Sequence, residues 1–66
     1  MENIIGNRIR EHREAMKLSQ KQLAKNLGVN HATVSTWEKG IAEPRVFYAI
    51  CLAQFFGTTV EELFAP

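Results

Sequence analysis

The 66-residue chain contains one cysteine, two prolines and four glycines, and each low count excludes a class of protein. A single cysteine cannot form an intramolecular disulfide, and no cysteine–histidine cluster supplies a zinc site, so the usual supports of small secreted domains are missing. Few prolines and glycines leave too few turns for a many-stranded sandwich or barrel. The longest apolar run, residues 46–53, is far shorter than the roughly 20 residues of a membrane span. We therefore expect a reduced, cytoplasmic protein with no membrane segment and no metal site.

The length of the chain leaves little room for the deep pocket of an enzyme. A chain of this size buries only about 60% of the surface that its unfolded form exposes. With 45% hydrophobic and 23% charged residues, it is globular rather than disordered. The candidate nucleophiles or ligands His12, His31 and Cys51 have no spacing that joins them into a known catalytic constellation. We predict one domain over residues 1–66 that is not an enzyme and uses no cofactor.

The net charge is only +1, but the charges are unevenly distributed. Residues 1–39 carry seven basic and four acidic side chains, a net charge of +3, whereas residues 40–66 carry one basic and three acidic side chains, a net charge of −2. This asymmetry is consistent with a basic face toward an anionic partner. Small domains also often carry uneven charge, and that alternative stays open.

Hydrophobic periodicity and capping signals predict an all-α chain with helices over about residues 4–16, 20–27, 31–39, 45–56 and 60–64. Ser19 with Gln22, and Thr59 with Glu62, have the spacing of capping boxes at two helix starts. Asn30 is a suitable N-cap for the third helix. The first helix carries one apolar stripe, which consists of Ile5, Ile9, His12 and Met16.

The second and third predicted helices are separated only by residues 28–30, which include a glycine. Such a short turn is typical of a helix-turn-helix, in which the second helix crosses the first steeply and projects outward. At about 100° per residue, Val34 and Trp37 face inward. Small and hydrogen-bonding side chains on the outward side fit a major groove, although an ordinary solvated face is the alternative. That outward sector contains His31, Ala32, Ser35, Thr36 and Lys39.

The run from Ser19 to Gly40, SQKQLAKNLGVNHATVSTWEKG, resembles the helix-turn-helix of the lambda-repressor-like family of phage and bacterial regulators. That family includes Cro, cI and the xenobiotic-response-element group. The S-Q-x-x-L-A start, the G-V turn and the V-S-x-W-E-x-G close carry the resemblance, which extends over nearly the whole chain. It implies a compact five-helix DNA-binding domain and a sequence-specific, repressor-like regulator of transcription. A protein-interaction module, such as an antitoxin or adaptor, is the alternative use of this fold.

The resemblance also implies roles for individual residues, with residues 31–39 as the recognition helix in the major groove. It implies an ion pair between Arg13 and Glu38 that ties the first helix to the recognition helix. The DNA bases would be read by Asn30, His31, Ala32, Ser35 and Thr36. The DNA backbone would be contacted by Gln20, Lys39, Arg45, Arg10 and Lys21.

Double-stranded DNA is thus the expected partner, and no small-molecule ligand is expected. Because two-fold operators have half-sites about 34 Å apart, we expect a homodimer that is weak in solution and completed on DNA. We expect no appended oligomerisation domain, so this domain itself would form the dimer. Tyr48, Phe55 and Phe64 are candidates for that contact, although ordinary core packing is the alternative for at least half of such aromatics.

Two positions depart from the pattern of the family. Lys17 stands where many relatives have glycine, which leaves the geometry at the end of the first helix open. His12 occupies a position where leucine is usual, and we expect it to be a packed, hydrogen-bonded side chain rather than a ligand.

Overall fold

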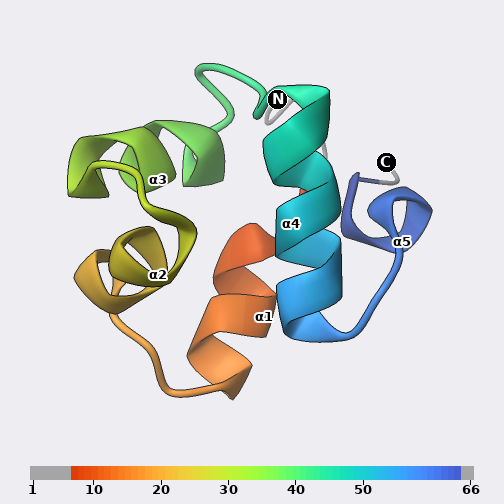
Figure 1. The fold of residues 1–66 in the computed structure, drawn as a ribbon, viewed down its shortest axis with the longest axis horizontal. Coiled ribbons are helices and arrows are strands. Elements are labelled where there is room, and N and C mark those ends of the chain that lie inside the picture. The colour runs from red at the N-terminus through yellow and green to blue at the C-terminus, as the bar shows by residue number, and fades with distance from the viewer. Residues whose placement is uncertain (1–6, 65–66) are drawn as a thin grey trace.

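The computed structural model describes residues 7–64, and in that range it contains helices but no strand. Figure 1 shows α2 and α3 at one edge of the molecule, α5 at the opposite edge, and α1 and α4 between them. The predicted all-α, five-helix fold is confirmed. None of the described helices has the length and apolarity needed to cross a bilayer. The helices are α1 (Ile9–Ala15), α2 (Gln20–Leu27), α3 (His31–Glu38), α4 (Val46–Phe56) and α5 (Val60–Phe64).

The first helix is shorter than predicted. Residues 4–6, where we expected it to begin, lie outside the described residues, and α1 begins only at Ile9. At its other end α1 stops at Ala15, one residue before the predicted end. Met16 is 47% exposed and does not extend the apolar stripe, because it is the C-cap residue at which the chain leaves the helix.

Every helix contributes one side chain that is completely buried. These apolar side chains form a single cluster, in which Trp37 of α3 also takes part with 5% of its surface exposed. Burying a side chain of this size contributes about 1.5–3 kcal/mol, so the cluster is the main stabilising feature of the fold. Its fully buried members are Ile9, Leu23, Val34, Leu52 and Leu63.

His12 joins the outer part of this core through an aromatic contact. Its ring stacks on Phe56 of α4, with ring centroids 5.3 Å apart and planes inclined by 25°. The side chain is half-buried, so the expected packing is present, but within residues 7–64 this stack rather than a hydrogen bond accounts for it.

Four of the described helices end in the same backbone motif. A residue with positive φ follows each of α1 to α4, and three of these residues are glycines. The next residue then donates its amide N–H to the carbonyl five positions earlier, as Leu18 does to Arg13 at 3.1 Å and Val29 to Ala24 at 3.0 Å. This is the Schellman arrangement. After α1 the residue is Lys17, with φ of 60°, so the same helix end forms there although the Cβ of lysine makes this conformation costly.

The predicted helix starts differ in how completely they are capped. At α2 the capping box is complete, because Ser19 Oγ accepts from the Gln22 amide and Gln22 Oε1 accepts from the Ser19 amide. At α5 only half of the predicted box forms, since Thr59 Oγ1 accepts from the Glu62 amide at 3.0 Å. The Glu62 carboxylate lies instead 3.4 Å from Nη1 of Arg8, whose positive charge competes for it. The predicted capping box at α5 is therefore confirmed for the Thr59 side chain and wrong for the Glu62 side chain.

The beginning of the described chain is attached to its end. The amide of Arg8 donates to the carbonyl oxygen of Leu63 at 2.8 Å, and the Arg8 guanidinium donates to the carbonyl oxygen of Glu62. These bonds hold α5, which has only five residues, against the start of α1.

Candidate nucleic-acid interface

The recognition helix predicted from the sequence, α3, has one buried and one outward edge. Val34 is fully buried and Trp37 is 5% exposed, and both anchor the inner edge in the core. On the opposite edge His31, Ala32 and Lys39 are exposed, and Ser35 and Thr36 are half-buried. The predicted groove-reading side therefore faces away from the interior.

Two polar side chains near this edge have distinct local contacts. The Thr36 hydroxyl donates to the carbonyl oxygen of Ala32 at 2.8 Å, a bond within the helix that uses its hydrogen and leaves its oxygen able to accept. Asn30 occupies the N-cap position with an extended backbone, but its side chain makes no capping bond to α3. Its amide is therefore not used to hold the helix start.

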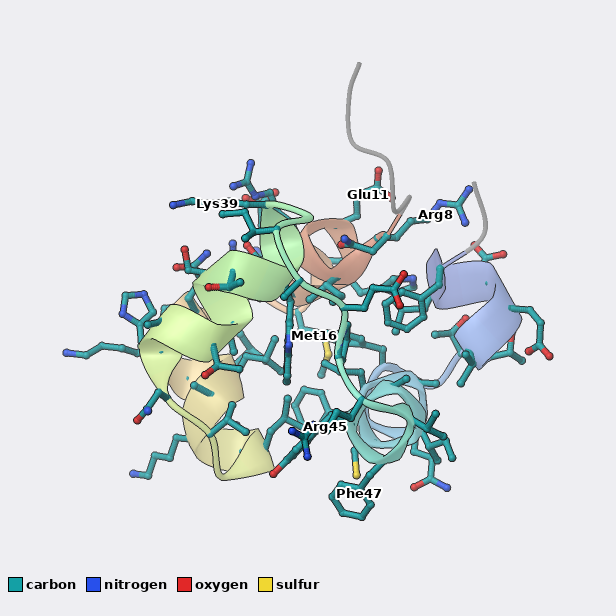
Figure 2. All side chains as sticks on the ribbon, turned by 90° about the horizontal axis from the view of Figure 1, so that it is seen from above. Arg8, Glu11, Met16, Lys39, Arg45 and Phe47 are labelled. Atoms are coloured by element: carbon teal, nitrogen blue, oxygen red, sulfur yellow. The ribbon has the colours of Figure 1, made fainter. Side chains whose placement is uncertain are left out.

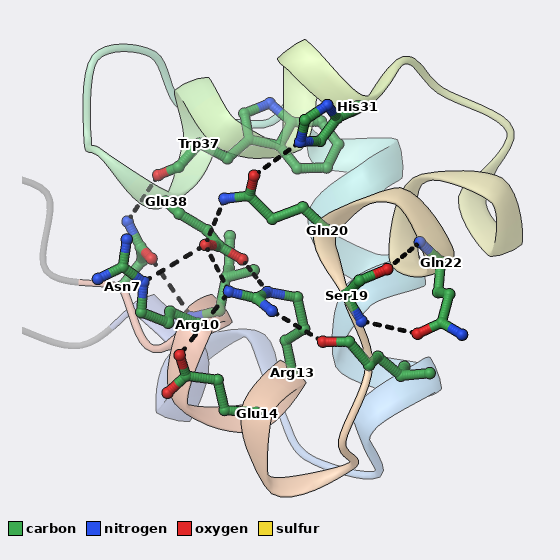
Figure 3. Close-up of polar contacts among 12 residues, drawn as sticks. Asn7, Arg10, Arg13, Glu14, Ser19, Gln20, Gln22, His31, Trp37 and Glu38 are labelled. Atoms are coloured by element: carbon green, nitrogen blue, oxygen red, sulfur yellow. Dashed lines mark hydrogen bonds and ion pairs between the residues drawn. The ribbon is translucent and has the colours of Figure 1, made fainter.

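Arg13 and Glu38 form a two-pronged ion pair between α1 and α3 (Figure 3). Arg13 Nε lies 2.6 Å from Glu38 Oε2, and Arg13 Nη2 lies 3.2 Å from Glu38 Oε1. The Glu38 side chain has no exposed surface and that of Arg13 is 11% exposed. Arg13 also donates from Nη1 to the carbonyl oxygen of Leu18 at 2.8 Å. One guanidinium thus fixes the position of α3 and of the chain between α1 and α2.

Arg13 and Glu38 each stabilise the charged form of the other. Burial alone would raise the pKa of Glu38, but hydrogen bonds from Arg13 and Gln20, the Arg13 charge and a bond from Arg10 outweigh it and hold that pKa below its ordinary value. The hydrogen bond to Glu38 is the main reason that the pKa of Arg13 is raised. Glu38 is consequently an ionised carboxylate that only accepts hydrogen bonds.

Gln20, expected to contact the DNA backbone, lies between Glu38 and His31. Its Nε2 donates to Glu38 Oε1 at 2.9 Å, and its Oε1 lies 2.9 Å from His31 Nε2. Gln20 and His31 are the first residues of α2 and α3, and the crossing of the two helices brings their starts together. We did not predict this link from the sequence, since helical periodicity carries no information about contacts between two helices.

The cations expected at the DNA backbone come from several elements. Lys21, Lys39 and Arg45 are exposed, and Figure 2 shows Lys39 at the end of α3 and Arg45 at the start of α4. Arg10 is 59% exposed, and its Nε lies 3.5 Å from Glu38 Oε1. The exposed guanidinium of Arg10 is therefore a further partner of the buried Glu38 carboxylate. This contact of Arg10 was also not predicted.

The aromatic side chains proposed for a dimer contact are not the most exposed apolar groups. Tyr48, Phe55 and Phe64 are partly buried and pack against the core. Val46 and Phe47, at the start of α4, are instead 74% and 67% exposed, and Figure 2 shows Phe47 projecting from the molecule. The most exposed apolar side chains at the start of α4 are therefore other residues than those predicted for the dimer contact.

The possible catalytic groups have separate surroundings. His12 stacks on Phe56, His31 contacts Gln20, and Cys51 is a half-buried free thiol in α4. Within the described residues, no three histidine, cysteine, aspartate or glutamate side chains are grouped so as to hold a metal ion.

Comparison with known proteins agrees with this geometry. The sequence pattern of the helix-turn-helix family matches residues 9–63. An HTH-type transcriptional regulator of Methanocaldococcus jannaschii is 38% identical over 58 residues, which cover 88% of each chain. The HTH-type transcriptional regulator DicA of Escherichia coli is 50% identical over 40 residues, which cover 61% of this chain and 30% of DicA. The cryptic phage CTXphi transcriptional repressor RstR of Vibrio cholerae is 32% identical over 60 residues, which cover 91% of this chain and 54% of RstR.

The matched region spans α1 to α5 up to Leu63, and so includes the buried anchors of α3, its outward edge and the Arg13–Glu38 pair. The predicted resemblance, the DNA-binding function and the absence of enzymatic activity are confirmed by the family and by these relatives. The chain is a member of the lambda-repressor-like helix-turn-helix family of DNA-binding transcriptional regulators.

Proposed function

We propose that this regulator, a repressor-like protein of the cytoplasm, reads a specific duplex sequence with the N-terminal part of α3 in the major groove. The observation that carries the proposal is the outward edge of α3, where small and hydrogen-bonding side chains stand opposite the anchors Val34 and Trp37. Small side chains allow a helix to approach the base edges closely, and their polar groups pair with those edges.

The proposed base-reading residues offer different chemistry. Ala32 and the Thr36 methyl group would contact a thymine methyl, and the Ser35 hydroxyl would donate or accept. The Asn30 amide, which makes no capping bond, is suited to a base or a flanking phosphate. His31 adds a ring nitrogen at the start of the helix.

The proposed backbone contacts surround this edge. The exposed cations Lys21, Lys39 and Arg45 would neutralise phosphates. Arg10 would do so with the part of its guanidinium that is free of Glu38. Gln20 has one amide hydrogen beyond the one given to Glu38, and this hydrogen would reach a phosphate near the start of α2.

The first test is the salt dependence of binding to a site selected from a random duplex pool. Neutralising several phosphates per dimer should give a slope of about −4 to −6 in log K against log salt concentration. A pure interaction module would select no sequence from the pool and would show no such slope, which would contradict the proposal.

The second test separates base reading from backbone contact. Ser35→Ala and Thr36→Ala should each relax discrimination at one base pair by about 1–3 kcal/mol. Lys39→Ala should weaken all sites alike and reduce the salt slope by about 1. Lys25→Ala, an exposed lysine of α2 outside the proposed contacts, serves as the matched control and should leave both quantities unchanged.

We further propose a homodimer on a two-fold operator, with half-sites about one helical turn apart. A second copy of the chain would cover the exposed apolar side chains at the start of α4, since contiguous exposed apolar surface marks interaction sites. Phe47→Ser should abolish cooperative occupation of two half-sites while leaving binding to one half-site intact. Unchanged cooperativity would exclude this contact.

A further inference from the structure

A chain of hydrogen bonds runs from the buried ion pair to the outward edge of α3 (Figure 3). Glu38 Oε1 accepts from Arg13 and also from Nε2 of Gln20, at 3.2 and 2.9 Å. Because an ionised carboxylate has no hydrogen to donate, the side of the Gln20 amide that faces Glu38 must be the NH₂ group. The amide oxygen of Gln20 is then directed to His31.

The same reasoning fixes the state of the His31 ring. The Gln20 oxygen only accepts hydrogen bonds, so His31 Nε2, 2.9 Å away, must carry a hydrogen. A neutral imidazole has a single N–H, and the hydrogen bond made by one ring nitrogen determines the state of the other. Nδ1 of the neutral ring is therefore left with a lone pair.

We propose that the Glu38–Gln20–His31 chain holds neutral His31 as its Nε2–H form, so that Nδ1 accepts from an amino group in the major groove. This inference rests on the proposed base-reading role of His31. The groups it selects are N6 of adenine and N4 of cytosine, the only base donors in that groove. Guanine and thymine present acceptors there, which would meet a lone pair. Gln20 is thus a positioning residue for specificity, acting through His31.

The ring state is measured first, in the free protein. The ¹⁵N chemical shifts of the His31 ring distinguish the nitrogen that carries hydrogen from the bare one, at a pH of about 8, where histidines are ordinarily neutral. Nε2 should carry the hydrogen, and Gln20→Met should give a mixture of both forms. Gln54→Met, the same change at an exposed position of α4, should leave the wild-type spectrum. A wild-type ring with its hydrogen on Nδ1, or one unaffected by Gln20→Met, overturns the proposal.

The base preference is measured next, on the site selected from the duplex pool. The base pair that loses discrimination in His31→Ala identifies the contact, and any such pair contains one base with an amino group in the major groove, adenine or cytosine. Replacing that base by an analogue that lacks the exocyclic amino group should weaken binding about tenfold. In Gln20→Met, the ratio of the affinities for the natural base and for the analogue without the amino group should be close to one.

The two measurements separate this inference from the proposed function. Unchanged binding after the amino group is removed from the base pair that His31 reads would overturn the inference and leave DNA reading by α3 standing. A pool that yields no site at all would overturn the proposed function, and with it the inference, whatever the ring spectrum shows.

Discussion

α1 packs against α3 and against α4, and different groups make the two contacts. Toward α3, Arg13 and Glu38 pair through two nearly buried hydrogen bonds. Toward α4, His12 stacks on Phe56, and the fully buried Ile9 of α1 belongs to the apolar cluster that also contains Leu52 of α4. The first contact is directional, because each hydrogen bond requires a particular distance and angle, whereas the second depends mainly on the apolar area removed from water.

The two contacts contribute differently to the stability of the fold and to the orientation of α3. A buried ion pair loses much of its attraction to the cost of dehydrating its charges, so it adds little net stability over an apolar pair of equal volume. The Arg13–Glu38 pair does, however, fix how α3 is rotated relative to α1, and Glu38 further orients Gln20. We infer that the apolar contacts stabilise the fold and that the ion pair positions α3, the proposed reading helix.

The largest expected effect is on the apolar side. Leu52→Ala should lower the free energy of unfolding by about 3–5 kcal/mol, because it leaves a cavity among fully buried neighbours. Ile50→Ala, in the same helix at a residue that is 45% exposed, should cost less than about 1 kcal/mol. Urea denaturation measures both, and equal losses would contradict the assignment of the core.

On the polar side, Glu38→Gln should cost about 3 kcal/mol in urea denaturation, because it leaves the Arg13 charge unpaired and nearly buried. Glu14→Gln removes a carboxylate that lies 3.9 Å from the same guanidinium but is 63% exposed, and should cost less than about 1 kcal/mol. An unchanged stability of Glu38→Gln would show that the pair is not energetically buried.

Acid should act selectively on the same contact. Since the pKa of Glu38 in the folded protein lies below its ordinary value of 4.5, its charge stabilises the fold fully above about pH 4.5. That contribution should be lost as the pH falls from 4.5 through the lower folded value. Melting curves across this range should show the gap between wild type and Glu38→Gln narrowing. The exposed Glu61→Gln should follow the wild type, and a constant gap would refute this assignment.

The smallest effect is a gain. Lys17→Gly should raise the free energy of unfolding by about 1 kcal/mol. The backbone has a φ of 60° at this position, which glycine adopts without the steric cost that the Cβ of lysine imposes. Lys25→Gly, at an exposed position inside α2, should instead cost about 1 kcal/mol. A thermal melt in which both substitutions destabilise would show that the end of α1 is not strained.

Local signals in the sequence predicted most of the fold. The bounds of α2 agree with the prediction because Ser19 and Gly28 mark its two ends through their own hydrogen bonds and backbone angles. The inner edge of α3 follows from the helical period, which places Val34 and Trp37 on one side. Lys17 gives no comparable signal, because lysine has no preference for positive φ.

Local signals could not predict contacts between residues that are far apart in the sequence. The Thr59–Glu62 pattern takes no account of Arg8, which is 54 residues from Glu62 and competes for its carboxylate. The Gln20–His31 contact depends on how α2 and α3 cross, which no spacing records. The Arg13–Glu38 pair was expected from the family resemblance alone, since 25 residues separate its members.

The hydrogen bond from the Arg8 amide to the Leu63 carbonyl has a consequence for attaching other protein segments. It joins the residue before α1 to the end of α5, and Figure 1 shows α5 at the edge of the molecule opposite α2 and α3. A tag, linker or additional domain fused after α5 would therefore be attached at the side of the molecule remote from the proposed base-reading edge of α3.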